Sequence, residues 1–112
     1  SVSTIPSDPS TICTYTCQCT GASSSSLWRI YDPNTITMDI NITNCSLSEM
    51  PVYFTGLVGT SMHSIAVGYN AIYSSTINFF RVFAYSMQGQ NSTTMLSYAQ
   101  ANAWSLNWFG MY

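Results

Sequence analysis

Charge is the property that this sequence most clearly lacks. Charged residues make up 5% of its 112 residues, lysine is absent, and the only bases are Arg29 and Arg81. Average soluble proteins carry about 25% charged residues, and their surface charge keeps neighbouring molecules apart. This chain must therefore be kept in solution by something else, such as attached sugar, or must bury its surface in an assembly.

The shortage of charge excludes several partners. Two arginines cannot supply the basic footprint of a nucleic-acid-binding protein or the attraction to an anionic membrane surface. No apolar run approaches the roughly 20 residues of a membrane span. No charged segment followed by an apolar stretch marks a signal peptide, so we interpret Ser1 as a mature N-terminus or the start of a fragment.

Groups suited to catalysis or metal binding are also scarce. His63 is the only histidine, and without a G-x-S-x-G turn we expect it to be a strand residue with a satisfied hydrogen bond. The spacing of Asp32, Asp39 and Glu49 does not favour the carboxylate pair of a glycosidase. The cysteines lack the paired knuckles of a zinc site. We therefore expect no enzyme activity, no metal and no cofactor.

Three N-glycosylation sequons stand out among the residues that are present. They begin at Asn41, Asn44 and Asn91. Asn91 lies in a polar, glycine-containing turn, and Asn41 falls on the polar side of an alternating strand, so both positions have room for a glycan. Asn44 is less favoured because it is close to Asn41 and precedes a cysteine. Glycans at these positions would compensate for the missing charge.

The four cysteines are Cys13, Cys17, Cys19 and Cys45, and with the sequons they indicate an oxidising compartment. Residues 12–20 alternate as a strand, along which Cys13 and Cys17 would lie about 13 Å apart, beyond disulfide reach. Cys45 can bond only one of the other three. The remaining two must meet through a local turn, bond to another chain or stay free.

The chain divides into two parts by composition. Residues 1–26 form an N-terminal arm in which half of the residues are Ser or Thr and which ends in the hinge-like run 23–26. Residues 27–112 form the core domain. We expect residues 1–20 of this arm, with Ile12 and Tyr15, to dock as an extended segment on the sheet edge of a neighbouring subunit. The alternative is that it folds back onto its own domain.

The core domain has the pattern of short antiparallel strands, with no internal repeat. Residues 95–103 are the one helix-tolerant stretch and could form a single turn. We expect strand 77–85 to pair near strand 103–109. The fold class is therefore all-β, an antiparallel β-sandwich with an extended N-terminal arm. The expected strands are 27–31, 35–43, 52–58, 62–67, 69–73, 77–85 and 103–109.

Aromatic residues are the most informative surplus, at 14% of the chain. Exposed aromatic rings stack on sugars and form assembly interfaces, whereas buried ones only fill the core. We name Tyr73, Arg81 and Trp108 as candidate contacts with a sugar or a protein partner. Six tyrosines cannot all be buried in a core of this size, namely Tyr53, Tyr69, Tyr73, Tyr85, Tyr98 and Tyr112.

Residues 51–110 resemble a domain of secreted proteins from protists, algae and other aquatic microbes. The closing Trp-rich strand and the aromatic strand before it are also similar to H-type lectins. Such lectins are small antiparallel β-sandwiches that bind N-acetylgalactosamine at subunit boundaries, so the resemblance implies that fold and a sugar partner. The matching residues are Gly59, Thr60, Ser61, His63, Ala71, Ile72, Tyr73, Ser74, Thr76, Phe80, Arg81, Val82, Ala99, Trp104, Asn107, Trp108 and Gly110.

Two functions follow from these observations. The first is a structural subunit of a secreted, extracellular glycosylated filament or coat, which assembles with copies of itself through the N-terminal arm. The second is a lectin-like carbohydrate-binding module. The missing charge, the cysteines and the sequons favour the first function, whereas the aromatic residues and the resemblance favour the second.

Overall fold

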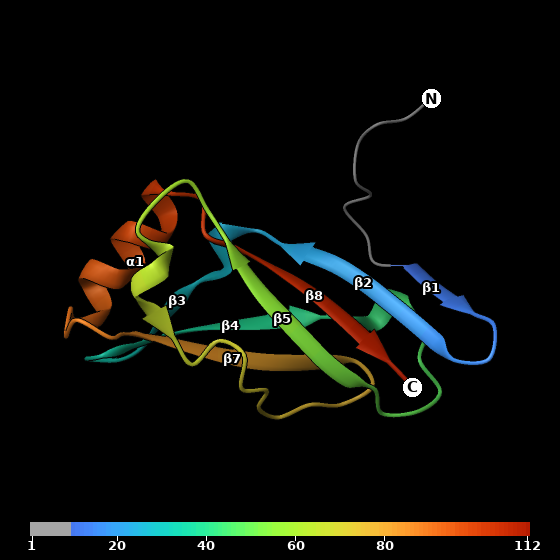
Figure 1. Ribbon diagram of the computed structural model, residues 1–112. Coiled ribbons are helices and arrows are strands. Elements are labelled where there is room, and N and C mark those ends of the chain that lie inside the picture. The colour runs from blue at the N-terminus through green and yellow to red at the C-terminus, as the bar shows by residue number, and fades with distance from the viewer. Residues whose placement is uncertain (1–9) are drawn as a thin grey trace.

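The computed structural model describes residues 10–112 as two packed, four-stranded antiparallel sheets (Figure 1). The expected all-β antiparallel sandwich is confirmed. Sheet A has the order β1-β2-β8-β5, formed by Ser10–Cys13, Cys17–Ser23, Ser105–Met111 and Val52–Val58. Sheet B has the order β3-β4-β7-β6, formed by Arg29–Asp32, Thr35–Asn41, Phe79–Ser86 and Ala66–Val67. The helical segments are α1 at Ser92–Ala101 and three single 3-10 turns at Ser25–Leu27, Thr43–Cys45 and His63–Ile65.

The core lies between the two sheets and is filled by alternate residues of each strand. A period of two places every second side chain on the inner face, and β4 and β7 show it most clearly. Burial of these apolar side chains is the main stabilising term of the fold. The inward residues of β4 and β7 are Ile36, Met38, Ile40, Phe80, Val82 and Ala84, and those opposite them include Cys19, Tyr53, Leu106 and Trp108.

Gly21 in the middle of β2 makes room for the largest of these inward side chains. It is the register partner of Trp108, and a Cβ at position 21 would lie 2.7 Å from the indole ring. The ring therefore lies directly against the backbone of β2 at Gly21. The ring of Phe80, from the opposite sheet, lies edge-on to Trp108 at 5.8 Å between centroids. This contact joins the two sheets at the centre of the core.

The expected pairing of strand 77–85 with strand 103–109 was wrong. β7 pairs with β4 and β6, whereas β8 pairs with β2 and β5, so the two strands belong to different sheets. They pack face to face through side chains instead of sharing a hydrogen-bond ladder. Both are rich in aromatic residues because each lies at the centre of its sheet and contributes to one shared core.

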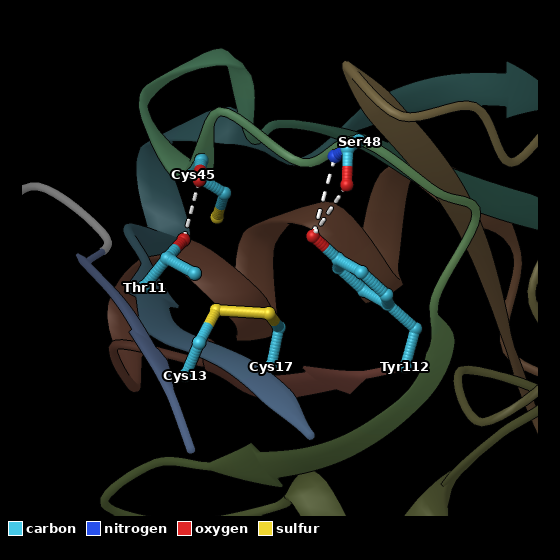
Figure 2. The surroundings of a disulfide bond; sticks show 6 residues. All are labelled: Thr11, Cys13, Cys17, Cys45, Ser48 and Tyr112. Atoms are coloured by element: carbon cyan, nitrogen blue, oxygen red, sulfur yellow. Dashed lines mark hydrogen bonds between the residues drawn. A yellow bond between two sulfur atoms is a disulfide. The ribbon is translucent and has the colours of Figure 1, made fainter. Parts of the chain in front are cut away.

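The cysteine-rich segment is a hairpin rather than the single strand expected at residues 12–20. The chain reverses between β1 and β2, which brings Cys13 opposite Cys17 in the ladder and allows a disulfide between them (Figure 2). A second disulfide joins Cys19 to Cys45. The local-turn alternative is therefore the one observed, and none of the four cysteines is free. Two disulfides indicate an oxidising environment.

Further bonds tie the hairpin to the loop that carries Cys45. The hydroxyl of Thr11 donates to the carbonyl oxygen of Cys45, and β2 pairs with β8 of the same chain over residues 18–23 (Figure 2). The expected docking of residues 10–20 on a neighbouring subunit was therefore wrong, since these residues complete sheet A of their own chain. Residues 18–23, which precede the boundary expected after residue 26, pair with β8 of the core domain. The part of the N-terminal arm at residues 1–9 lies outside the described residues.

Two segments differ locally from expectation. Of the strands expected at 62–67 and 69–73, only β6 forms, and Tyr73 makes a single bridge to Arg81. Residues 92–101 form a full α-helix instead of one turn, because Asn91 caps its start by accepting a hydrogen bond from the Thr94 amide at 2.9 Å. Met95 and Ala99, one turn apart, bury one side of α1.

Candidate binding site

Both arginines of the chain converge on one carboxylate on the outer face of sheet B. Asp39 on β4 is the register partner of Arg81 on β7, and Arg29 lies on the adjacent strand β3. Arg81 donates from Nε to Asp39 Oδ1 at 2.5 Å and from a terminal nitrogen to Oδ2 at 3.2 Å, a two-pronged contact. Arg29 donates to the same Oδ2 at 3.0 Å. We call Arg29, Asp39 and Arg81 the ion triad.

The ion triad itself carries one net positive charge. The hydrogen bond from Arg81 is the largest influence on the pKa of Asp39 and lowers it, with Arg29 adding to the effect. The same contact raises the pKa of Arg81. All three groups are therefore ionised at neutral pH, with two positive charges against one negative charge. The contacts also hold the planar guanidinium of Arg81 in a fixed orientation.

An aromatic hollow lies on the same face of sheet B. Its volume is about 410 Å³. The rings of Tyr31 and Tyr73 stand edge-on to Phe83, with centroids 4.8 and 4.9 Å from it and interplanar angles of 70° and 79°. Tyr31, Tyr73 and Tyr85 are each about half exposed, so their rings are accessible from solvent. The hollow is lined by Tyr31, Asp32, Thr35, Tyr73, Phe83 and Tyr85.

The backbone links the hollow to the ion triad. Tyr73 and Arg81 exchange two backbone hydrogen bonds of 2.8 Å each, which fix the loop before β7 against that strand. Arg81, Phe83 and Tyr85 alternate along β7 and so project from one face. The site therefore combines accessible aromatic rings, a carboxylate at Asp32 and an oriented guanidinium.

Of the three residues named as candidate contacts, Tyr73 and Arg81 lie together at the site, whereas Trp108 lies in the core. Trp108 is 5% exposed and lies in the core, so its ring is not accessible to a partner in this structure. Its position next to Gly21 could not be read from alternation alone. Tyr31, Phe83 and Tyr85 were missed as site residues. The signal for Phe83 and Tyr85 is the run of odd-numbered aromatic and charged residues in β7, opposite the apolar even-numbered ones.

The site has no features of a metal centre or a hydrolase. Residues 10–112 contain no group of His, Cys, Asp and Glu side chains that could hold a metal ion. His63 lies in a 3-10 turn rather than in a strand, and its buried Nδ1 has no hydrogen-bond partner within the described part of the chain, so the expected bond is not found. His63 does not line the hollow. No helix in residues 10–112 is long and apolar enough to cross a membrane.

The three sequon asparagines lie on the surface. Asn41 ends β4, Asn44 lies in a 3-10 turn, and Asn91 precedes α1; all three are exposed. The amide oxygens of Asn41 and Asn91 each accept one backbone hydrogen bond, at 2.9 Å from Thr43 and Thr94. In both cases the amide nitrogen, which is the atom that a glycan modifies, is not used in that bond.

Comparisons with known proteins give no relative for this chain. No protein-family model matches it, and no curated protein or solved structure matches it either. The function must therefore be argued from the site itself.

Proposed function

We propose that this chain is a carbohydrate-binding module of a secreted, N-glycosylated extracellular protein, and that the aromatic hollow on sheet B is its sugar site. The accessible rings of Tyr31 and Tyr73 on either side of Phe83 are the observation that carries the proposal. Sugar rings present C–H groups that pack on aromatic faces, whereas their hydroxyls need polar partners. Asp32 at the hollow and the fixed Arg81 beside it supply such partners.

The extracellular setting of this proposal rests on two features. Two disulfides are stable in an oxidising compartment such as the extracellular space. Sequons at Asn41, Asn44 and Asn91 are all exposed, as acceptance of a glycan requires. Attached glycans would keep a chain with 5% charged residues in solution.

Nuclear magnetic resonance titration of the whole chain with a panel of methyl glycosides tests the proposal. We would begin with N-acetylgalactosamine, because the H-type lectins that the sequence resembles bind this sugar. Shifts should appear in sheet B near Tyr73. Tyr73→Ala should weaken binding about two- to tenfold, the range expected for one aromatic contact. Tyr15→Ala is the matched control, because Tyr15 is fully exposed in the β1–β2 turn.

The titration has two outcomes that would reject the proposal. The first is an absence of shifts with every glycoside at high concentration. The second is binding that Tyr73→Ala leaves unchanged, which would place the sugar elsewhere.

A structural subunit of an extracellular filament or coat is the second candidate function. The low charge supports it, and so does the outer face of sheet A, where Ile12, Val52 and Phe54 are more than half exposed. Assembly through residues 10–20 as a free arm is no longer part of this candidate, because those residues are bonded within their own chain.

A further inference from the structure

The sandwich has four edge strands, and three of them are protected against pairing with other chains. β1 has four residues and β6 has two, so neither offers a long template. β3 carries Arg29 and Asp32 and contains a register shift. Short length, charge and irregular pairing are the usual protections of an edge. β5 has none of them: its seven residues are uncharged and pair with β8 without a shift.

The free side of β5 has no backbone partner within residues 10–112. Its only ladder is the one to β8. The loop before β7 attaches to β5 through side chains on the inner face, where Tyr53 donates to the carbonyl of Thr76 and Thr55 donates to that of Tyr69. The outer face of β5 is exposed, with Phe54 at 58%. Within residues 10–112 the backbone groups on this side of β5 are thus unpaired, and its outer side chains are exposed.

We propose that β5 forms an antiparallel pair with β5 of a second copy of this chain. The two-fold axis that relates the two copies passes through the pair at Thr55. This register places Val52 opposite the second copy's Val58 and Phe54 opposite the second copy's Gly56. Thr55 then faces its own counterpart. The two copies of sheet A join into one continuous eight-stranded sheet. The surface involved is separate from the sugar site, so the inference does not depend on carbohydrate binding.

The fit between Phe54 and Gly56 favours a second copy as the occupant over an unrelated strand. An added Cβ at Gly56 would meet no atom within 4 Å, so the outer face is open there. A neighbouring aromatic ring covers an edge glycine well, and the two-fold register supplies one from each copy. Val52 and Val58 of the two copies flank these contacts on the same outer face, and β-branched residues pack well on a strand surface. The absence of charge on β5 means that no like charges oppose the pairing.

Sedimentation velocity of the whole chain over a wide concentration range tests the proposal. The chain should show a reversible monomer–dimer equilibrium. Gly56→Lys introduces a charge on both sides of the axis and should raise the dimer dissociation constant by roughly tenfold or more. Ile12→Lys is the matched control, because it adds the same charge to the same outer face at the opposite edge. It should change the constant by less than about twofold.

Hydrogen exchange supplies a second readout that does not depend on a variant. Amides of Val52–Val58 should become more protected as the concentration of the wild-type chain rises, while amides of β1 should not. The proposal would be overturned by a monomer at all concentrations. It would also be overturned by a dimer that Gly56→Lys leaves intact, or by one that Ile12→Lys disrupts equally.

Discussion

The indole nitrogen of Trp28 donates a hydrogen bond to the backbone carbonyl of Trp104 at 2.8 Å, inside the core. The indole nitrogen of Trp104 in turn donates to the carbonyl of Ser61, also at 2.8 Å. Two buried rings thus join three segments that are far apart in the sequence. Each ring combines a large apolar contact with a polar group whose hydrogen bond is satisfied, as buried tryptophans require.

Shortening these rings should therefore be costly. Trp104 is fully buried, so Trp104→Ala should lower the free energy of unfolding by about 3–5 kcal/mol. Trp28→Phe keeps most of the ring but leaves the Trp104 carbonyl without its donor, which should cost about 1–3 kcal/mol. Urea unfolding followed by circular dichroism measures both changes. If Trp104→Ala changed the free energy of unfolding by no more than the experimental error, the place of Trp104 in the core would be contradicted. Tyr15→Ala is the control and should leave the free energy of unfolding unchanged.

Tyr53 should make the fold sensitive to alkaline pH. Burial raises its pKa to about 12 from a usual value of 10.0, because the charged form is poorly solvated there. The folded state holds the Tyr53 proton more tightly than the unfolded state does. The contribution of the protonated Tyr53 to the free energy of unfolding is therefore fully present below pH 10 and is lost as the pH rises towards 12. Thermal unfolding as a function of pH should show the loss. Tyr53→Phe removes the ionisable group, so its stability should decline less over that window.

The two disulfides should differ in their contribution to stability. Cys19–Cys45 closes a loop with a sequence separation of 26, whereas Cys13–Cys17 closes one of 4. On the loop-entropy estimate, the first should stabilise the fold by about 3–4 kcal/mol and the second by about 2 kcal/mol. Differential scanning calorimetry of the paired alanine variants, Cys19→Ala/Cys45→Ala and Cys13→Ala/Cys17→Ala, compares them. A larger loss from the Cys13–Cys17 pair would contradict the estimate.

Asn91 should carry a glycan and cap α1 at the same time. Its amide oxygen accepts from Thr94, while the amide nitrogen takes the sugar. Glycopeptide mass spectrometry of native protein should find Asn91 and Asn41 modified, and Asn44 less so because it is close to Asn41. Asn91→Asp keeps a capping oxygen and loses the glycan, whereas Asn91→Ala loses both. Asn91→Ala should therefore lower the free energy of unfolding by about 1 kcal/mol more than Asn91→Asp does. Unmodified Asn91 in native material would contradict the first expectation.

Alternation made β4 of sheet B predictable and left the topology of sheet A open. The period of two in residues 35–41 placed Ile36, Met38 and Ile40 inside, as the structure shows. The same rule treated residues 12–20 as one strand, because a tight reversal at Tyr15 carries no glycine or proline to mark it. The disulfide partners follow from that reversal and could not be assigned before it was known.

The candidate site was only partly visible for a similar reason. Tyr73 and Arg81 could be named as exposed aromatic and charged residues, but their contact depends on a loop that crosses to β7. Asp39 was considered only as a member of a carboxylate pair, whereas its partners Arg29 and Arg81 are 10 and 42 residues away in the sequence. Strand order, which single-sequence patterns do not encode, brings the three together.

The position of β8 sets an order of events for folding. β8 lies between β2 and β5, and it follows both of them in the chain. Until its residues leave the ribosome, neither neighbour has a partner from the centre of its sheet, whereas β3, β4, β6 and β7 can already meet. Sheet A can therefore be completed only after β8 is available, through contacts distant in sequence that form slowly. Until then the uncharged β5 has no strand partner on either side, so its backbone groups and apolar side chains stay exposed to other chains.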